Sequence, residues 1–375
     1  MKPKSGPFWR GALSLSCTCL LAVSLLSGCD STPSPPPKPG ASPAATKTPP
    51  KMVRIGFMAP DDPDPRLSGT RNFLQGMEEH GWVDGVNLTV EYRYTGSSSD
   101  LARAAAEDLV RLGVDVIVTV GTVRTEAAQK ATRSIPIVMT NSGDPVASGF
   151  VKSLARPGGN ITGMSLLSPG LAAKRLVLLK ETIPSIRRVL VLWNPDNSSA
   201  QAGLRETEAA ASASNIRVIA RKVRTPEELA AALQSAKSER VGAIVPLGDQ
   251  LFFARRAEIA RFAREHRMAT MHDLRPYVAA GGLMSYGPNL PVLYRRAATH
   301  VDKILRGANP AELPVEQPSK FFLVVNLETA CGLGITIPDS IALQVTELLG
   351  TSASREPPQA RGPRAASPGA RPVDR

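Results

Sequence analysis

The chain has 375 residues and a formal net charge of +12, with 42% hydrophobic and 21% charged residues. Two thirds of the net positive charge lies in the first 52 and the last 25 residues, which leaves +4 on the central part. A nucleic-acid-binding protein needs a concentrated basic patch on a folded face, so this distribution argues against nucleic acid as a partner. The roughly 300 central residues are enough for two lobes of ordinary domain size.

The first 28 residues have the pattern of a lipoprotein signal peptide. A basic start with Lys2, Lys4 and Arg10 precedes an apolar stretch that is too short and too rich in Ser and Cys for a membrane-spanning helix. The stretch ends in LSGC (26–29), which resembles a bacterial lipobox and predicts that Cys29 is diacylated and becomes the mature N-terminus. The alternative is an ordinary secretory signal with an incidental cysteine.

The segments on either side of the central part are predicted to stay unfolded. Residues 29–52 are dense in Pro, Ser, Ala and Thr and predict a tether, and residues 351–375 predict a disordered basic tail. Asp30 resembles the signal that retains lipoproteins at the inner membrane of enterobacteria. Only Cys331 remains in the central part, which excludes an intramolecular disulfide there, and we expect it to be a packed small residue.

Strand and helix patterns alternate through residues 53–162. Apolar or alternating runs predict the strands, and stretches with capping residues predict the helices between them. In chain order we expect strand 53–58, helix 66–80, strand 87–94, helix 101–112, strand 114–120, a helix after Gly121-Thr122, and strand 135–139. This is the order of a doubly wound α/β sheet.

A Pro-Gly-Gly-Asn turn at 157–160 interrupts the series, and a second series follows. We expect helix 171–182, strand 188–193, an Ala-rich helix, strand 216–223, a helix starting at Thr225-Pro226, strand 241–247, helix 255–266 and strand 268–271. A Gly-rich crossing at 281–289 then precedes helix 293–305, strand 321–326 and a last helix near Glu328. The halves 53–162 and 164–286 repeat one pattern, which predicts two similar lobes with a hinged cleft.

Five motifs, found in order along the chain, give a more specific indication: GDPV (143–146), LARPGGNITG (154–163), VLWNP (191–195), GGLMSYGPN (281–289) and LPVEQP (313–318). Over residues 53–349 the chain resembles the ABC-transporter substrate-binding lipoproteins related to tryptophan- and tyrosine-binding proteins. The resemblance implies a type I periplasmic-binding-protein fold with three crossings between lobes. It places residues 53–162 and 287–313 in lobe I, and residues 163–286 and 314–350 in lobe II.

Two loops at strand ends of lobe I are candidate ligand sites, because ligands of open α/β sheets bind beyond the carboxyl ends of the strands. Gly121 and Thr122 open a helix whose N–H groups and dipole favour a ligand carboxylate; the alternative is that Thr122 only caps the helix. Asn141 and Asp144 follow the next strand. Asp144 either pairs with a ligand ammonium or caps the turn before Pro145.

Lobe II supplies a matching set. Asp249 stands at a strand end, where it either meets an ammonium across the cleft or caps a helix. Tyr286 lies in a crossing segment and is suited to stack on a flat ligand. Asn194 binds the ligand or caps the next helix, and Met58 of lobe I lines the pocket or belongs to the core.

The sequence gives little support for an enzyme. There is no phosphate-binding Gly-Lys-Thr loop, no nucleophile elbow and no paired-cysteine motif, and the four histidines show no metal-ligand spacing: His80, His266, His272 and His300. We therefore expect no catalytic residue, cofactor or metal.

The favoured function is a solute receptor, anchored to the membrane by lipid and facing the periplasm. It would bind a small molecule, an aromatic or other amino acid, and deliver it as a monomer to an ABC permease and its ATPase. The alternatives are a sensory protein that reports its ligand to a membrane receptor and an enzyme that acts in the cleft.

Overall fold

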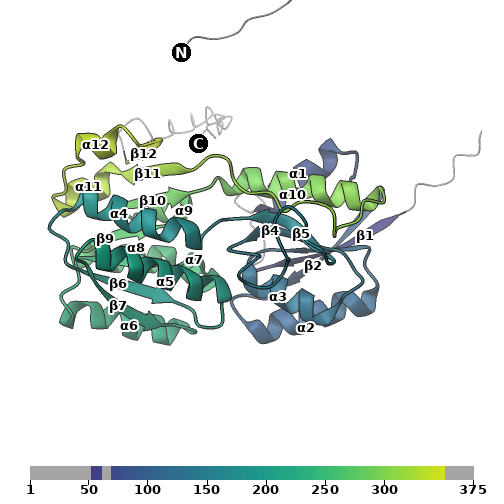
Figure 1. Ribbon diagram of the computed structural model, residues 1–375, viewed down its shortest axis with the longest axis horizontal. Coiled ribbons are helices and arrows are strands. Elements are labelled where there is room, and N and C mark those ends of the chain that lie inside the picture. Colours follow the sequence, from purple (N-terminus) through teal and green to yellow (C-terminus); the bar gives the residue numbers. More distant parts are fainter. Residues whose placement is uncertain (1–51, 61–68, 351–375) are drawn as a thin grey trace, which may run out of the picture. The chain divides into compact units, whose positions relative to one another are not determined.

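The computed structural model describes residues 52–60 and 69–350, which form two β-sheets with helices on both faces (Figure 1). The predicted signal peptide, the lipidation site Cys29, nearly all of the tether and the C-terminal tail lie outside the described residues. Within the described part, the helices are all too short or too polar to cross a membrane. The predicted α/β class with two doubly wound sheets is confirmed.

Among the described residues, the first sheet contains five parallel strands in the order β2-β1-β3-β4-β5. They are β1 (Val53–Ala59), β2 (Leu88–Tyr94), β3 (Val116–Thr119), β4 (Ile137–Ser142) and β5 (Ile161–Ser165). The chain steps to the opposite side of β1 after β2, so a topological switch point lies between β1 and β3.

The second sheet repeats this order with β7-β6-β8-β9-β10 and then adds β11 and β12. Its strands are β6 (Arg188–Trp193), β7 (Arg217–Lys222), β8 (Ala243–Pro246), β9 (Ala269–His272), β10 (Met284–Gly287), β11 (Phe322–Asn326) and β12 (Glu347–Leu349). Only the pair β10–β11 is antiparallel among the described strands. The corresponding switch point lies between β6 and β8.

In the described part of the chain, four helices cover the first sheet: α1 (Gly69–Glu79), α2 (Ser99–Leu112), α3 (Thr122–Ala131) and α10 (Leu290–Leu305). Ile55 and Phe57 of β1 pack towards α1 and α10, whereas Met58 packs towards α2 and α3. Successive side chains of a strand point to opposite faces, so each face has its own core. Helix α2 is capped by Ser98, whose side chain accepts from Leu101 N–H at 3.2 Å.

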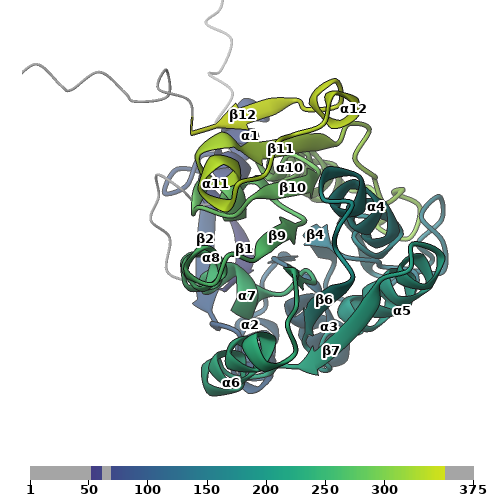
Figure 2. The same ribbon diagram turned by 90° about the vertical axis from the view of Figure 1, so that its left-hand side faces the viewer.

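The second sheet is covered by short and long helices on both faces (Figure 2). They are α4 (Ala172–Thr182), α5 (Ser198–Ala213), α6 (Pro226–Ser238), α7 (Gln250–Ala254), α8 (Arg256–Glu265), α9 (Arg275–Ala279), α11 (Leu327–Leu333) and α12 (Asp339–Ala342). On β6, Val189 and Val191 join the core under α4 and α5, while Leu190 and Leu192 join the core under α6 and α8. The predicted helix start at Thr225-Pro226 is confirmed, because the Thr225 hydroxyl accepts from Glu228 N–H at 3.2 Å.

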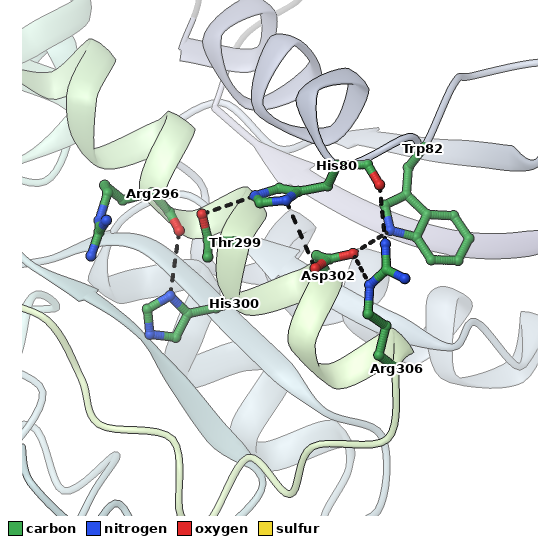
Figure 3. Close-up of polar contacts among 7 residues, drawn as sticks. All are labelled: His80, Trp82, Arg296, Thr299, His300, Asp302 and Arg306. Atoms are coloured by element: carbon green, nitrogen blue, oxygen red, sulfur yellow. Dashed lines mark hydrogen bonds and ion pairs between the residues drawn. The ribbon is translucent and has the colours of Figure 1, made fainter. Parts of the chain in front are cut away.

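Helix α10 packs on the first sheet although it follows β10 of the second sheet in the chain. Asp302 of α10, which is buried, accepts from Trp82 Nε1 at 2.9 Å and from Arg306 Nε at 2.7 Å (Figure 3). His80, at the end of α1, contacts Thr299 Oγ1 at 3.1 Å. These contacts join α10 to α1, so the chain passes between the two sheets after β5, after β10 and again before β11.

Several short elements were not predicted. Strands β5 and β10 lie in stretches that the sequence predicted as Gly-rich crossings, and α7, α9, α12 and β12 had no counterpart. The segments ITGMS and MSYG have few β-branched residues, so their pairing with β4 and β9 decides their conformation. The prediction that Cys331 is packed is wrong, because its side chain is exposed at the end of the short helix α11.

The approach of β5 to β4 at Gly163 gives a test of this packing. Gly163 has φ +126°, and a Cβ there would overlap Met139 O and lie 2.6 Å from Met139 N. We expect Gly163→Ala to lower the free energy of unfolding by at least about 2 kcal/mol in urea titrations, because the main chain cannot move aside cheaply. The control Gly159→Ala meets nothing within 4 Å and should be nearly neutral. Equal stability of the two variants would contradict this account.

Candidate functional site

Buried polar side chains gather at the carboxyl ends of the parallel strands. In the first sheet, Thr122, Asn141 and Ser142 follow or end β3 and β4, and all three are buried. In the second sheet, Asn194 and Asp273 follow β6 and β9 and are also buried. Loops at this edge supply ligand-binding groups in open α/β sheets, so this is the candidate site.

The loop after β3 is held by the loop after β4. The N–H of Gly121, which has φ +80°, donates to Asn141 Oδ1 at 2.8 Å. The N–H of Gly143 donates to Thr122 Oγ1 at 3.3 Å. Helix α3 begins at Thr122 with Gly121 in the N-cap position and without a side-chain cap, so the alternative that Thr122 is the N-cap is wrong.

Asp144 caps a turn. Its Oδ1 accepts from the N–H groups of Val146 and Ala147, at 3.1 and 2.9 Å. This is the structural role that the sequence left open beside a ligand contact. Met58 is likewise fully buried in the core under α2 and α3, which is the core alternative.

Asp249 is surrounded by hydrogen-bond donors. Oδ1 accepts from Leu251 N–H at 2.9 Å and thereby caps α7, and Oδ2 accepts from Asn194 Nδ2 at 3.2 Å and Asn197 Nδ2 at 3.0 Å. Burial raises the pKa of Asp249, while these hydrogen bonds and the charge of Arg124 on α3 act in the opposite direction. The carboxyl group is therefore largely committed to the fold, and Asn194 is committed to Asp249.

A second pair of charged groups at this edge was not predicted. Arg175 of α4 is 5% exposed; its Nε donates to Tyr286 O at 2.8 Å and its Nη1 to Ser168 O at 3.0 Å. Asp273, directly after β9, is 4% exposed. Among the described residues, Arg175 Nη2 and Asp273 Oδ1 are buried without a hydrogen-bond partner. Ser142 Oγ is also buried without a hydrogen-bond partner among the described residues.

The electrostatics of this pair follow from burial. Burial lowers the pKa of Arg175 and raises the pKa of Asp273, and the charge of each partly offsets the shift of the other. Within the described residues the two form no ion pair at or below 4.0 Å, so each keeps an unsatisfied charged atom. A buried charge without a full set of partners is costly, which makes the pair a candidate for contacting a ligand.

Sequence signals for the two residues existed but were weak. Arg175 lies on the same face of α4 as Ala172, Leu176 and Leu179. This face is buried, and an apolar residue is usual at such a position. Asp273 directly follows β9, beside His272, and was not among the residues predicted to contact a ligand. His272 is in fact buried, stacks on Tyr277 at 4.3 Å and has a pKa lowered to about 3 by burial.

The first turn of α5 lies directly against the loop after β4. Ser198 Oγ donates to Ser148 Oγ at 2.9 Å. A Cβ on Gly143 would overlap Ser199 Oγ and lie 2.6 Å from Ser199 Cβ. The two sheets thus contact each other through their carboxyl edges, next to Thr122 and Asn197.

Tyr286 lies in β10 and is half-buried, with its ring 5.9 Å from that of Phe321. Its backbone carbonyl holds Arg175, so its position depends on the same cluster. In the described part of the chain, no group of three or more His, Cys, Asp or Glu side chains is placed to hold a metal ion.

Two repeated α/β sheets, joined by three crossings and meeting at their polar carboxyl edges, define a binding protein of the periplasmic type. Residues 57–348 match the family described as ABC transporter substrate binding protein, and the chain belongs to this family. A tyrosine-binding protein of Clostridioides difficile is 26% identical over 319 residues, which cover 84% of this chain and 90% of that protein.

Solved structures agree on the fold. An ABC domain from Streptococcus pneumonia in complex with L-Trp has a TM-score of 0.74 at 23% identity, covering 79% of this chain and 99% of that one. A leucine-binding protein from Thermotoga maritima has a TM-score of 0.52 at 16% identity, covering 69% of this chain and 84% of that one. The type I periplasmic-binding-protein fold and the relation to tryptophan- and tyrosine-binding proteins are confirmed.

The raised pKa of Asp273 predicts a pH dependence of stability. Above its unfolded value of 3.8, the folded protein binds the Asp273 proton more tightly than the unfolded chain does, so this group lowers stability as pH rises. The free energy of unfolding of Asp273→Asn minus that of wild type should therefore increase as the pH rises from 3.8 towards neutrality. Urea titrations at several pH values measure this difference. A difference that does not change with pH would refute the assignment.

Proposed function

We propose that this protein is the solute receptor of an ABC importer, that it works outside the cytoplasmic membrane, and that it binds an amino acid between two lobes. The lobes are those that the sequence predicted, each built on one of the two sheets. Membership in the substrate-binding family supports the transport role. The observation that carries the ligand class is the pair Arg175 and Asp273.

An amino acid zwitterion matches the charges of this pair. Arg175 Nη2 is a buried cationic donor and Asp273 Oδ1 a buried anionic acceptor, and each lacks a partner among the described residues. A ligand carboxylate on Arg175 and a ligand ammonium on Asp273 would satisfy both atoms. Charge-assisted hydrogen bonds of this kind are stronger than neutral ones and select against ligands that lack either charge.

The side chain of the ligand is proposed to be aromatic. A relative carries the name tyrosine-binding protein, and a solved relative holds L-Trp. In this chain, Tyr286 of β10 accepts a hydrogen bond from Arg175 through its backbone carbonyl, so its ring lies near the proposed carboxylate contact. The ring is half-buried and offers a face for stacking.

The residues predicted from sequence are proposed to act in two ways, as direct ligand contacts or as residues that position the loops. Gly121, Thr122 and Asn141 supply a buried polar edge at the start of α3 and are proposed as further ligand contacts. Asp249 and Asn194 are proposed to act indirectly, because their hydrogen bonds position the loops around the site.

Binding is proposed to close the two lobes. The contacts Ser148–Ser198 and Gly143–Ser199 join the two edges, and a ligand that touches both edges would favour the arrangement in which they form. The ligand-loaded receptor would then meet the permease as a monomer. Lipidation at Cys29 and the tether 29–52 would keep it at the membrane, with Asp30 favouring the inner membrane.

Calorimetric titration of the protein with L-Trp, L-Tyr, L-Leu and a sugar tests the ligand class. We expect binding of an aromatic amino acid and no binding of its decarboxylated amine, because the amine cannot contact Arg175. At 100 times its dissociation constant a ligand adds about 2.7 kcal/mol to the stability, which a thermal-shift assay detects. Arg175→Gln should weaken binding by about tenfold or more, as expected for loss of a hydrogen bond to a charged group.

Arg205→Gln on the exposed face of α5 is the matched control and should bind as wild type does. Circular dichroism checks that Arg175→Gln is folded. Equal affinity of the two variants would remove Arg175 from the site, and binding of a sugar alone would remove the zwitterion.

The closure contact gives an independent prediction. Gly143→Ala places a methyl group against Ser199 and should hold the two edges apart, which weakens ligand affinity by about tenfold or more. Ser199→Gly removes the obstacle, so the double variant Gly143→Ala/Ser199→Gly should recover most of the affinity. A double variant as weak as Gly143→Ala would show that the loss has another cause.

A further inference from the structure

A depression of about 630 Å³ lies at the amino edge of the second sheet, opposite to the edge that carries the candidate site. Its wall contains the starts of β6 and β9, the residue before β8 and the loop after α11. Four arginines line it, Arg187, Arg188, Arg240 and Arg267, and no acidic residue does. This volume is within the range of small-molecule sites.

Two of the arginines have a structural role. Arg187 donates to the carbonyl oxygens of Pro184 and Ile186, and Arg188 donates to the carbonyl oxygen of Glu239. Carbonyl groups at helix ends attract cations, so these two contacts need no further explanation.

Arg240 and Arg267 have no such role. Both are exposed, and within residues 52–60 and 69–350 neither guanidinium makes a hydrogen bond or an ion pair. Glu239, next to Arg240 in the chain, directs its carboxylate to Arg221 at 2.9 Å, and Glu265, two residues before Arg267, has its carboxylate 3.9 Å from Arg261. Among the described residues, the two cations that line the depression therefore have no acidic partner.

Their backbone conformation makes the choice of arginine more informative. Arg240 and Arg267 follow α6 and α8, and both have φ +52°, in the left-handed region. Glycine or asparagine is the usual residue there, as at Gly113 after α2 and Asn215 after α5. Arginine at both positions costs stability that the fold does not require, and such strain collects at functional sites.

We propose that this depression is a second binding site, which takes a phosphate-bearing anion. The guanidinium groups of Arg240 and Arg267 hold the phosphate oxygens, since the planar fork of arginine matches a phosphate in a bidentate arrangement. Arg187 and Arg188 add positive charge at the wall. The phosphate belongs either to a lipid headgroup or to a free anion, and both present the same chemistry to the site.

The double variant Arg240→Asn/Arg267→Asn tests the site, because asparagine suits the left-handed conformation and the variant should melt at the same temperature as wild type or higher. The matched control is Arg133→Gln/Arg156→Gln, which removes two exposed arginines from the first half of the chain. In the first arm, the full chain is titrated calorimetrically with inorganic pyrophosphate in a phosphate-free buffer. We expect the Arg240/Arg267 variant to bind at least about tenfold more weakly than wild type and the control.

In the second arm, the same proteins are sedimented with phosphatidylcholine vesicles with and without phosphatidylglycerol. All three proteins share both chain ends, so a difference between them reports the depression alone. A loss confined to the Arg240/Arg267 variant supports a free anion if it occurs with pyrophosphate, and a lipid headgroup if it occurs only with phosphatidylglycerol. Equal behaviour of variant and control in both arms overturns the proposal, whatever the result for amino acid binding.

Discussion

Parallel strand pairing is the constraint on which the arrangement of this protein depends. When strands run in one direction, all their carboxyl ends lie at one edge of the sheet and all their amino ends at the other. The first sheet is parallel throughout, and the second is parallel from β7 to β10. Residues as distant in the chain as Thr122 and Asp273 are therefore placed at corresponding edges, and the two edges meet where Gly143 contacts Ser199.

The carboxylates at these edges separate into two kinds by the donors around them. Asp249 receives hydrogen bonds from two asparagine side chains and a helix N–H, so its charge is satisfied by the fold itself. Asp273 is more deeply buried than Asp249, yet one of its oxygens has no donor among the described residues. Arg175 has the opposite charge, and its Nη2 is likewise buried without an acceptor among the described residues. A ligand with both a carboxylate and an ammonium group would supply the missing partners of Arg175 and Asp273. The proposed function rests on this difference between Asp273 and Asp249.

The opposite edge of the second sheet has its own chemistry. Helices that run antiparallel to the strands end there, so carbonyl groups accumulate and attract arginine side chains. Arg187 and Arg188 are explained by these carbonyls, but Arg240 and Arg267 stand in strained backbone without a partner. The same topology thus puts the proposed zwitterion site and the proposed anion site at opposite edges of the second sheet.

The sequence by itself determined the α/β class, the repeated strand order and the positions of most long elements, because these follow from local hydrophobic periodicity and capping, as at Thr225-Pro226. It also predicted the edge at which the candidate site lies. The tertiary structure decided which residues at that edge are already satisfied. The structure shows that backbone N–H groups donate to Asp144 and Asp249, which the sequence predicted as ligand contacts or caps. It also shows that Arg175, a helical residue with no distinct sequence signal, is buried. Hydrogen-bond satisfaction depends on partners far away in the chain, and no local pattern encodes it.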